Sequence, residues 1–316
     1  MRLATRVLSR QPLADGVLGL RLGAAGLPAF EAGAHVDLHL GNGLVRSYSL
    51  TNDGREPAHY ELAVGLAADS RGGSAWVHQH LQPGATIEVS APRNHFALDD
   101  SMRPVLLVAG GIGVTPIHAM AQACERRGRP WRLVYAARSL RAAAFLEELG
   151  TLAALGGGDR LRLHLDDEQA GRPLDVAALR PWAGAGTELY CCGPAGLMNA
   201  VRDQLADAGA RLHFEWFSAA PDPQAAEAGA FEVVIASTGQ RVPVAAQCSV
   251  LSALEAAGVV VPSVCQEGVC GTCECRVLGG HIDHRCQVLT DDERARQDTM
   301  MVCVSRAHSA ELVLDL

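Results

Sequence analysis

The stretch CQEGVCGTC, residues 265–273, has the spacing Cys-x4-Cys-x2-Cys. A fourth cysteine, Cys303, follows 30 positions after Cys273 in the run TMMVCVS. This is the ligand spacing of a plant-type [2Fe–2S] cluster, in which four thiolates hold two irons. Gly268 and Gly271 should let the loop curl and turn its amides toward sulfur, because glycine tolerates positive φ. The spacing predicts a cluster held by Cys265, Cys270, Cys273 and Cys303, and a protein that moves single electrons.

Two other interpretations of the cysteines stay open at this point. They could be buried free thiols, or the loop could hold zinc, although zinc loops prefer paired Cys-x2–4-Cys knuckles. Disulfides are disfavoured, because the N-terminus lacks the apolar segment of a signal peptide and the remaining cysteines are scattered. The same two observations predict a cytoplasmic protein.

The composition excludes several functional classes. The chain has 316 residues and is 48% hydrophobic, enough for two or three domains with their own cores. It contains no uncharged apolar run of about 18 residues, so no membrane span is expected. Its net charge is −8 and it has no lysine, which excludes a Walker A loop and lysine Schiff-base chemistry. Without a basic block, nucleic-acid binding is not expected.

Residues 1–100 contain short alternating runs separated by glycine and proline turns. Such runs predict an antiparallel sheet or small barrel. One run, Arg46-Ser47-Tyr48-Ser49-Leu50, places a cation and an aromatic ring on one face of a strand and two hydroxyls on the other. An ordinary strand is the alternative interpretation.

A second feature of this region is Gly72-Gly73-Ser74, which leads into the helical pattern AWVHQHL. Backbone amides and the helix dipole converge at a helix N-terminus and favour an anion there. Together with Arg46, this helix start could hold a phosphate monoester. A simple turn with an N-cap serine would look the same in sequence.

From about residue 102, apolar runs alternate with helical patterns. This alternation predicts a parallel α/β sheet that binds its ligand at the carboxyl ends of the strands. The first strand ends in a glycine-rich loop that departs from the G-x-G-x-x-G fingerprint but could still approach a pyrophosphate. Its residues are Gly110, Gly111, Gly113, Thr115 and Pro116.

Other candidates follow the later strands of this segment. Arg138 and Ser139 follow the second strand, where an adenosine ribose would lie, and leave the choice between NADH and NADPH open. Cys192 ends the fourth strand and could touch a nicotinamide or be a buried small residue. The aromatic run at residues 213–217, HFEWF, could be a wall against a ring system or core packing.

The remaining sequence predicts a linker and a small C-terminal domain. Residues 219–229, AAPDPQAAEAG, are rich in proline and alanine and lack apolar periodicity, as is typical of linkers. We therefore expect domains at residues 1–100, 101–218 and 230–316, the last an α+β domain around the cysteine loop.

Six motifs occur along the chain in the order RSYSL, GGS, GGIGVTP, CCGP, HFEWF and the cysteine loop. Together they make the whole chain resemble the phthalate dioxygenase reductase family, which includes the vanillate O-demethylase reductases. The resemblance implies a flavin-binding antiparallel β-barrel, an α/β nucleotide-binding domain and a C-terminal plant-type ferredoxin of the β-grasp type. It also implies FMN as the flavin and NADH as the usual donor, with NADPH not excluded.

The resemblance assigns roles to the motif residues. Arg46 would pair with the FMN phosphate, which Gly72, Gly73 and Ser74 would cradle. Tyr48 and Ser49 would face the flavin ring, with Ser49 near its N5 atom, and Ser47, which precedes them on the strand, would also contact the cofactor. Gly110, Gly111, Gly113, Thr115 and Pro116 would line the nicotinamide and pyrophosphate cleft, and Arg138 and Ser139 would lie at the ribose. Ser49, Cys192, Glu215 and Phe217 would border the reacting rings.

The implied function is that of an oxygenase reductase component. NADH would deliver a hydride to FMN, and single electrons would pass through the cluster to a Rieske-type terminal oxygenase that acts on an aromatic acid or similar molecule. The expected protein is a monomer. A quinone, ferric chelate or haem protein could instead be the acceptor, and a zinc-binding nucleotide sensor is the rival of another class.

Overall fold

The structure, a computed structural model, describes residues 2–67, 72–157, 159–218 and 229–316. The chain divides into two compact units, Met1–Glu215 and Trp216–Leu316. The first unit contains two sheets, and the second contains one five-stranded sheet and a small two-stranded one. Within the described ranges, no helix has the length and apolar character needed to cross a bilayer.

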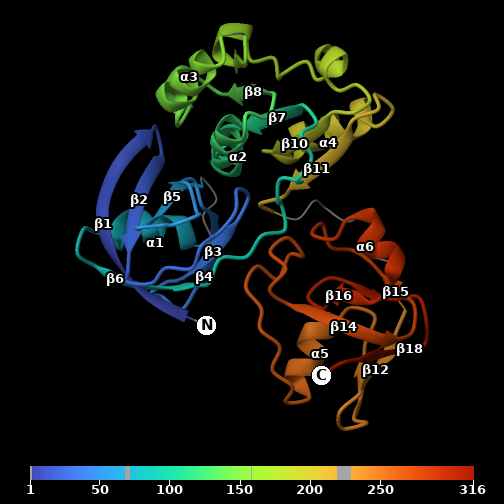
Figure 1. Cartoon of the computed structure of the whole chain (residues 1–316). Helices are drawn as coiled ribbons and strands as arrows, with labels where there is room; N and C mark the ends of the chain where they lie inside the picture. The colour runs from blue at the N-terminus through green and yellow to red at the C-terminus, as the bar shows by residue number, and fades with distance from the viewer. Residues whose placement is uncertain (1, 68–71, 158, 219–228) are drawn as a thin grey trace. The chain divides into compact units, whose positions relative to one another are not determined.

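The first sheet is an antiparallel barrel (Figure 1). Its strand order is β4-β3-β6-β1-β2-β5, and an antiparallel bridge between Leu50 and Leu62 joins the two ends of that order, which closes the sheet. Leu20, Val36 and Val64 are among the side chains that fill its core. The elements are β1 (Arg2–Ala14), β2 (Val17–Gly23), β3 (His35–His39), β4 (Val45–Ser49), β5 (Tyr60–Gly65), α1 (Gly73–His80) and β6 (Thr86–Ser90).

The second sheet is parallel throughout, with the order β11-β10-β7-β8-β9. The chain leaves the central β7 on one side to form β8 and β9, then crosses to the other side to form β10 and β11. The carboxyl ends of β7 and β10 therefore meet at the switch point where such sheets bind ligands. The elements are β7 (Val105–Gly110), η1 (Gly111–Gly113), α2 (Val114–Arg127), β8 (Trp131–Ala137), η2 (Leu140–Ala142), α3 (Leu146–Leu155), β9 (Leu161–Leu165), η3 (Asp167–Gln169), η4 (Ala177–Trp182), β10 (Glu188–Cys192), α4 (Ala195–Leu205) and β11 (Arg211–Glu215).

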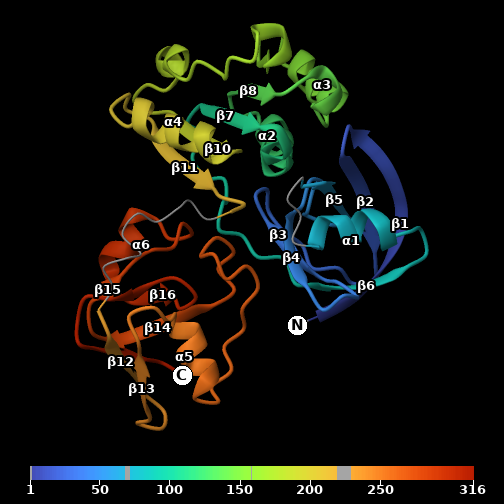
Figure 2. The same cartoon turned by 180° about the vertical axis from the view of Figure 1, so that it is seen from behind.

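The C-terminal unit is a mixed sheet with the order β13-β12-β18-β14-β16. Its first and last long strands, β12 and β18, pair in parallel at the centre, as in a β-grasp fold. Helix α5 lies against β13, as Figure 2 shows from behind. The elements are β12 (Phe231–Ile235), β13 (Arg241–Val244), α5 (Val250–Ala256), β14 (Glu274–Gly279), β15 (Ile282–Asp283), α6 (Asp291–Arg296), β16 (Thr299–Met301), β17 (Arg306–Ala307) and β18 (Glu311–Leu314). The predicted three-part fold is confirmed.

Two helices are shorter than the sequence runs that contain them. The run LRAAAFLEELGTLAAL starts at Leu140, yet α3 begins only at Leu146, because Phe145 takes a positive φ of 61°. In the run SVLSALEAAGVVVPSV at residues 249–264, α5 ends at Ala256, since Gly258 has a φ of 80° and β-branched valines follow it. The predicted linker lies outside the described residues, apart from Gly229.

A buried arginine holds the segment that joins the barrel to the parallel sheet. Arg129 is only 1% exposed, and its guanidinium donates to the Asp99 and Arg103 carbonyls at 2.8 and 2.7 Å. It also donates to Asp99 Oδ1 at 2.6 Å. Burial alone would raise the pKa of Asp99, but hydrogen bonds from Ser101 and Arg129 outweigh it and lower that pKa. The connector is therefore fixed by one cation.

We expect Arg129→Met to lower the free energy of unfolding of the first unit by about 3–5 kcal/mol, because it removes one partner of a buried ion pair. Denaturant titration followed by tryptophan fluorescence measures this. Arg127→Met is the matched control, since Arg127 reaches only the fully exposed Asp100 at 3.9 Å. That control should cost no more than about 0.5 kcal/mol. Equal losses in the two variants would contradict a special role for Arg129.

Candidate functional site

Two glycine-containing loops meet at the switch point of the parallel sheet. Cys192, the last residue of β10, pairs with Ala109 of β7, so the loops that follow these strands lie side by side. A Cβ on Gly113 would lie 2.3 Å from Cys192 O and 2.7 Å from Gly193 N. A Cβ on Gly193 would lie 3.0 Å from Gly110 Cα. The backbones of the two loops therefore approach each other more closely than residues with a Cβ would permit. Both loops lie at the carboxyl edge of the sheet, where such sheets bind their ligands.

The other residues predicted for the nucleotide lie at this edge too. Thr115 is buried and its hydroxyl donates to Ile112 O at 3.0 Å, which ties the glycine loop to the first turn of α2. Pro116 occupies that first turn, where the missing N–H costs no helical bond. Arg138 is exposed and Ser139 half-buried directly after β8, at the carboxyl end of the neighbouring strand. Burial raises the pKa of the Cys192 thiol, so this side chain is a neutral thiol and not a thiolate.

A cation and a helix start come together in the barrel. A Cβ on Gly73, the first residue of α1, would lie 2.7 Å from both Cγ and Nε of Arg46, so only glycine lets this arginine lie across the start of the helix. Gly72 caps the helix in the left-handed conformation with a φ of 87°. Positive charge and the N-terminal end of the helix dipole therefore face one position, which fits a phosphate monoester such as that of FMN.

The strand β4 divides its predicted residues between two faces. Ser47 donates to Asp37 Oδ1 at 2.7 Å, and Arg93 holds the other oxygen of that buried carboxylate at 2.6 Å. The Ser47 hydroxyl thus has a structural partner, which leaves its backbone for any cofactor contact. Burial raises the pKa of Tyr48 to about 12, so its phenol stays protonated.

The barrel and the parallel sheet contribute one residue each to a close polar pair. Ser49 Oγ lies 3.5 Å from Glu215 Oε2, at the outer limit of a hydrogen bond. Glu215 ends β11, so residues 166 positions apart in sequence meet here. Burial raises the pKa of Glu215 to about 8, although the Ser49 hydroxyl opposes the rise. Near pH 7 this carboxyl is mainly protonated. Phe217, which is 44% exposed, follows the boundary of the first unit, so its place beside these residues stays a prediction.

Strand pairing explains how the distant fourth cysteine reaches the cysteine loop. In the second unit β14 begins directly after Cys273 and pairs antiparallel with β16, which ends two residues before Cys303. The ladder continues one step past β14, because Val302 N donates to Cys273 O at 3.3 Å. Pairing of β14 with β16 therefore carries Cys303 to Cys273.

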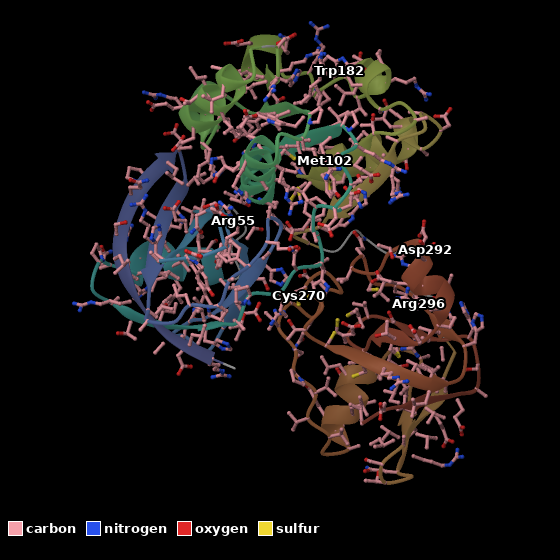
Figure 3. The ribbon with its side chains drawn as sticks, viewed as in Figure 1. Arg55, Met102, Trp182, Cys270, Asp292 and Arg296 are labelled. Carbon is pink, nitrogen blue, oxygen red and sulfur yellow. The ribbon has the colours of Figure 1, made fainter. Side chains whose placement is uncertain are left out.

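The loop itself has the curled backbone that its glycines predicted. Gly268 and Gly271 have φ values of 70° and 73°. A Cβ on Gly268 would lie 2.5 Å from Val304 Cγ2, so the position also lacks room for a side chain. Glu267 N donates to Cys265 Sγ at 3.3 Å, and the Thr272 hydroxyl lies 3.2 Å from Cys270 Sγ. Figure 3 labels Cys270 on this loop.

The four predicted ligands form a chain of contacts, from Cys270 to Cys265, from Cys265 to Cys303 and from Cys303 to Cys273. Hydrogen bonds from the Cys270 and Cys303 thiols lower the pKa of Cys265, and Cys303 acts in the same way on Cys273. Four cysteines, three in one loop and one at an adjoining strand end, are the donors of a [2Fe–2S] cluster, which spreads them over two irons. The donor set fits the iron–sulfur cluster.

Two contributors to these sites are not among the residues that the sequence predicts. Gly193 directly follows the end of a predicted strand, and that position is the sequence signal that marks it. Asn42 lies in the turn GNG, where its side chain accepts from Leu44 N at 3.1 Å and donates to Gly72 O at 3.5 Å. Nothing in the sequence connects that turn with the start of α1.

Comparison with known proteins identifies the family. The chain matches the oxidoreductase NAD-binding domain over residues 107–203 and the 2Fe-2S iron-sulfur cluster binding domain over residues 233–308. It is 48% identical over 307 residues to the phenoxybenzoate dioxygenase subunit beta of Ectopseudomonas oleovorans, covering 96% of this chain and 94% of that protein. A solved phthalate dioxygenase reductase is 37% identical, with a TM-score of 0.69 over 100% of this chain and 98% of that one. This chain belongs to the phthalate dioxygenase reductase family.

Membership in the phthalate dioxygenase reductase family establishes the cofactors and the class of reaction. The chain is an oxidoreductase that uses NADH, FMN and a [2Fe–2S] cluster, and it is a reductase component of an oxygenase system. The same architecture occurs in an intact type IV self-sufficient cytochrome P450 monooxygenase, with 39% identity and a TM-score of 0.91. The match covers 100% of this chain but 41% of the P450, so this chain spans about two fifths of that protein.

Gly113→Ala should lower kcat/KM for NADH about 100-fold, the effect of a misplacement of about 1 Å, because its Cβ collides with the backbone of Cys192 and Gly193. Stopped-flow measurement of flavin reduction tests this. Gly150→Ala is the control, since a Cβ there meets nothing within 4 Å. It should leave kcat/KM unchanged and stabilise α3 by up to about 1 kcal/mol. Wild-type kinetics in Gly113→Ala would refute the close-approach argument.

If Glu215 borders the flavin as predicted, the rate of flavin reduction by NADH should fall as the pH rises through about 8, because its ionisation would add a negative charge beside a ring that accepts a hydride. Glu215→Gln should abolish this pH dependence. The exposed Glu148→Gln serves as control and should retain the wild-type profile. An unchanged profile in Glu215→Gln would assign the titration to another group.

Proposed function

We propose that this chain passes single electrons from NADH to a Rieske-type terminal oxygenase that acts on an aromatic acid or a similar small molecule. The observation that supports the proposal is the combination, in one chain, of a barrel in which Arg46 lies across a helix start, a parallel sheet with glycine loops at its switch point, and four cysteines with cluster-ligand spacing. The phenoxybenzoate dioxygenase subunit and the phthalate dioxygenase reductase support the oxygenase partner, since each serves an oxygenase named for an aromatic acid.

In the nucleotide-binding half, the glycine loop would hold NADH at the carboxyl edge of the sheet. Gly110, Gly111 and Gly113 bring backbone amides to that edge without side chains between them and the pyrophosphate. Arg138 and Ser139 would meet the adenosine ribose, and Arg138 leaves NADPH as an alternative donor. The neutral thiol of Cys192 would lie behind the nicotinamide ring.

In the barrel, bound FMN would accept two electrons as a hydride and release them one at a time. Arg46 and the start of α1, with Gly72, Gly73 and Ser74, would bind and orient the phosphate. Ser49 would lie near the reacting edge of the flavin ring and donate to Glu215 Oε2, while the Glu215 carboxyl keeps its own proton near pH 7. Tyr48, protonated at all ordinary pH values, would exclude water from one face.

In the second unit, Cys265, Cys270, Cys273 and Cys303 would ligate the two irons. Their amide contacts would tune the potential, because hydrogen bonds to the sulfurs and solvent exposure set it in such clusters. The domain limits that follow are residues 1–100 for FMN, 101–218 for the nucleotide and 230–316 for the cluster, with residues 219–229 between the last two.

The proposal extends to the setting of the protein. None of the ten cysteines, all of which lie within the described residues, forms a disulfide, which supports a reducing cytoplasm. We propose a monomer, because a surface that must meet two partners in turn gains little from permanent burial.

A haem protein is the second candidate acceptor, supported by the fold shared with the self-sufficient P450. A quinone or a ferric chelate would use the same cofactor chain. Reconstitution separates these acceptors: the chain is mixed with candidate Rieske oxygenases and haem proteins from the same genome, and substrate turnover driven by NADH is followed. Turnover with an oxygenase supports the proposal, whereas turnover only with a haem protein or quinone replaces it.

Cys270→Ser should abolish electron transfer to cytochrome c while flavin reduction by NADH persists. The loss should exceed the roughly 10- to 100-fold effect of removing an outer-shell group at a metal site. Steady-state cytochrome c reduction and single-turnover flavin bleaching measure the two steps separately.

Cys275→Ser is the matched control for this experiment. Cys275 is two residues from Cys273 on β14, and burial raises the pKa of its thiol to about 12, as expected of an inert core cysteine. It should keep its cluster and its cytochrome c activity. Loss of flavin reduction in Cys270→Ser, or loss of the cluster in Cys275→Ser, would argue against the ligand assignment.

A further inference from the structure

We infer that Arg294 of α6 is a positioning residue for the cluster-binding loop, which it reaches through residues 285–287. The inference rests on the four-cysteine ligand set proposed above. It concerns a side chain outside the cysteine motif, from a helix that sequence reasoning did not associate with the cluster.

Residues 285–287 touch both chain segments that carry the ligands. Gln287 N donates to Gly268 O at 2.9 Å, in the middle of the cysteine loop. A Cβ on Gly268 would lie 3.1 Å from Cys286 Cα, so the two backbones are in direct contact. At the other end, Arg285 N donates to Ser305 Oγ at 3.3 Å, two residues after Cys303. The segment therefore bridges the cysteine loop and the strand end that supplies the fourth ligand.

Arg294 fixes this bridge from a rigid support. Its Nη2 donates to Cys286 O at 2.6 Å. The helix that carries it has only six residues but is held at both ends. At its start, Thr290 and Glu293 form a reciprocal capping box, with bonds of 3.3 and 2.8 Å. At its end, Gln297 Oε1 accepts from Ile282 N at 2.6 Å. A guanidinium on such a support sets the position of the carbonyl it binds.

The surroundings of Arg294 offer little to replace it. Among the described residues, the buried Arg294 Nε, both ring nitrogens of His284 and Gln287 Oε1 have no hydrogen-bond partner. Burial, followed by the charge of Arg294, lowers the pKa of His284, so its ring is a neutral neighbour. Loss of the guanidinium would leave the Cys286 carbonyl without its donor in an enclosed region, and such a group tends to move toward water. Movement of residue 286 would release Gly268 and expose the sulfurs.

A positioning role and a charge effect predict opposite signs. Removing a nearby positive charge stabilises the oxidised cluster and lowers its midpoint potential. Loosening the loop admits solvent to the sulfurs, which raises the potential. The sign of the change in an uncharged variant therefore separates the two explanations.

The test uses the full-length holoprotein and compares Arg294→Met with Arg296→Met. Arg296 lies on the same helix, labelled in Figure 3, and its one ion pair among the described residues is with the half-exposed Asp298 at 3.6 Å. Iron and sulfide content, the midpoint potential and the electron paramagnetic resonance spectrum of the reduced cluster are measured. Arg294→Met should keep its cluster, show broadened resonance lines, and raise the reduced-to-oxidised ratio at a fixed potential by about threefold or more. Arg296→Met should match the wild type.

An unchanged or lowered potential in Arg294→Met overturns the inference. If that variant does not fold, Arg294→Gln, which keeps an amide donor on a shorter side chain, is measured instead. Arg294→Gln should also raise the midpoint potential of the cluster, and the absence of such a rise would overturn the inference. A wild-type protein without iron and sulfide would contradict the ligand assignment itself, an outcome distinct from both.

Discussion

Close backbone approach that excludes a Cβ is the constraint on which all three cofactor sites depend. Gly113 lets the loop after β7 touch the backbone of Cys192, Gly73 lets Arg46 lie across the start of α1, and Gly268 lets the cysteine loop rest on Val304 and Cys286. In each place a methyl group would lie under 3 Å from its neighbour. Cofactors bound by backbone groups need such surfaces, because side chains would hold the ligand away from the amides.

The two sheets of the first unit are joined by polar contacts. Thr51 O accepts from Gln122 Nε2 at 3.2 Å and lies at the same distance from His118 Nδ1. Burial lowers the pKa of His118 and keeps its ring neutral. The same ring stacks on Phe145 at 4.4 Å, which helps to hold Phe145 at its unfavourable positive φ. These contacts set Ser49 of the barrel against Glu215 of the parallel sheet.

In the C-terminal unit, the four predicted ligands come from chain segments that are far apart in the sequence. Three lie in one loop, and the ladder between β14 and β16 delivers the fourth. Local hydrogen bonds then fix the positions of the Cys265 and Cys270 sulfur atoms. Residues 285–287 hold the loop through a backbone hydrogen bond. The predicted cluster ligands therefore all belong to the second unit, whereas the residues predicted to bind the flavin phosphate belong to the first.

Sequence alone determined the fold class and the kind of chemistry. The cysteine spacing, the period of the apolar runs and the glycine positions are local properties, and each maps directly onto a loop, a strand or a turn. The pairing of Ser49 with Glu215, the structural use of Ser47 by Asp37, the role of Arg129 in the connector and the late start of α3 were decided only by tertiary structure. They depend on which segments, remote in sequence, come to share one buried space, and burial rather than local pattern selects those partners.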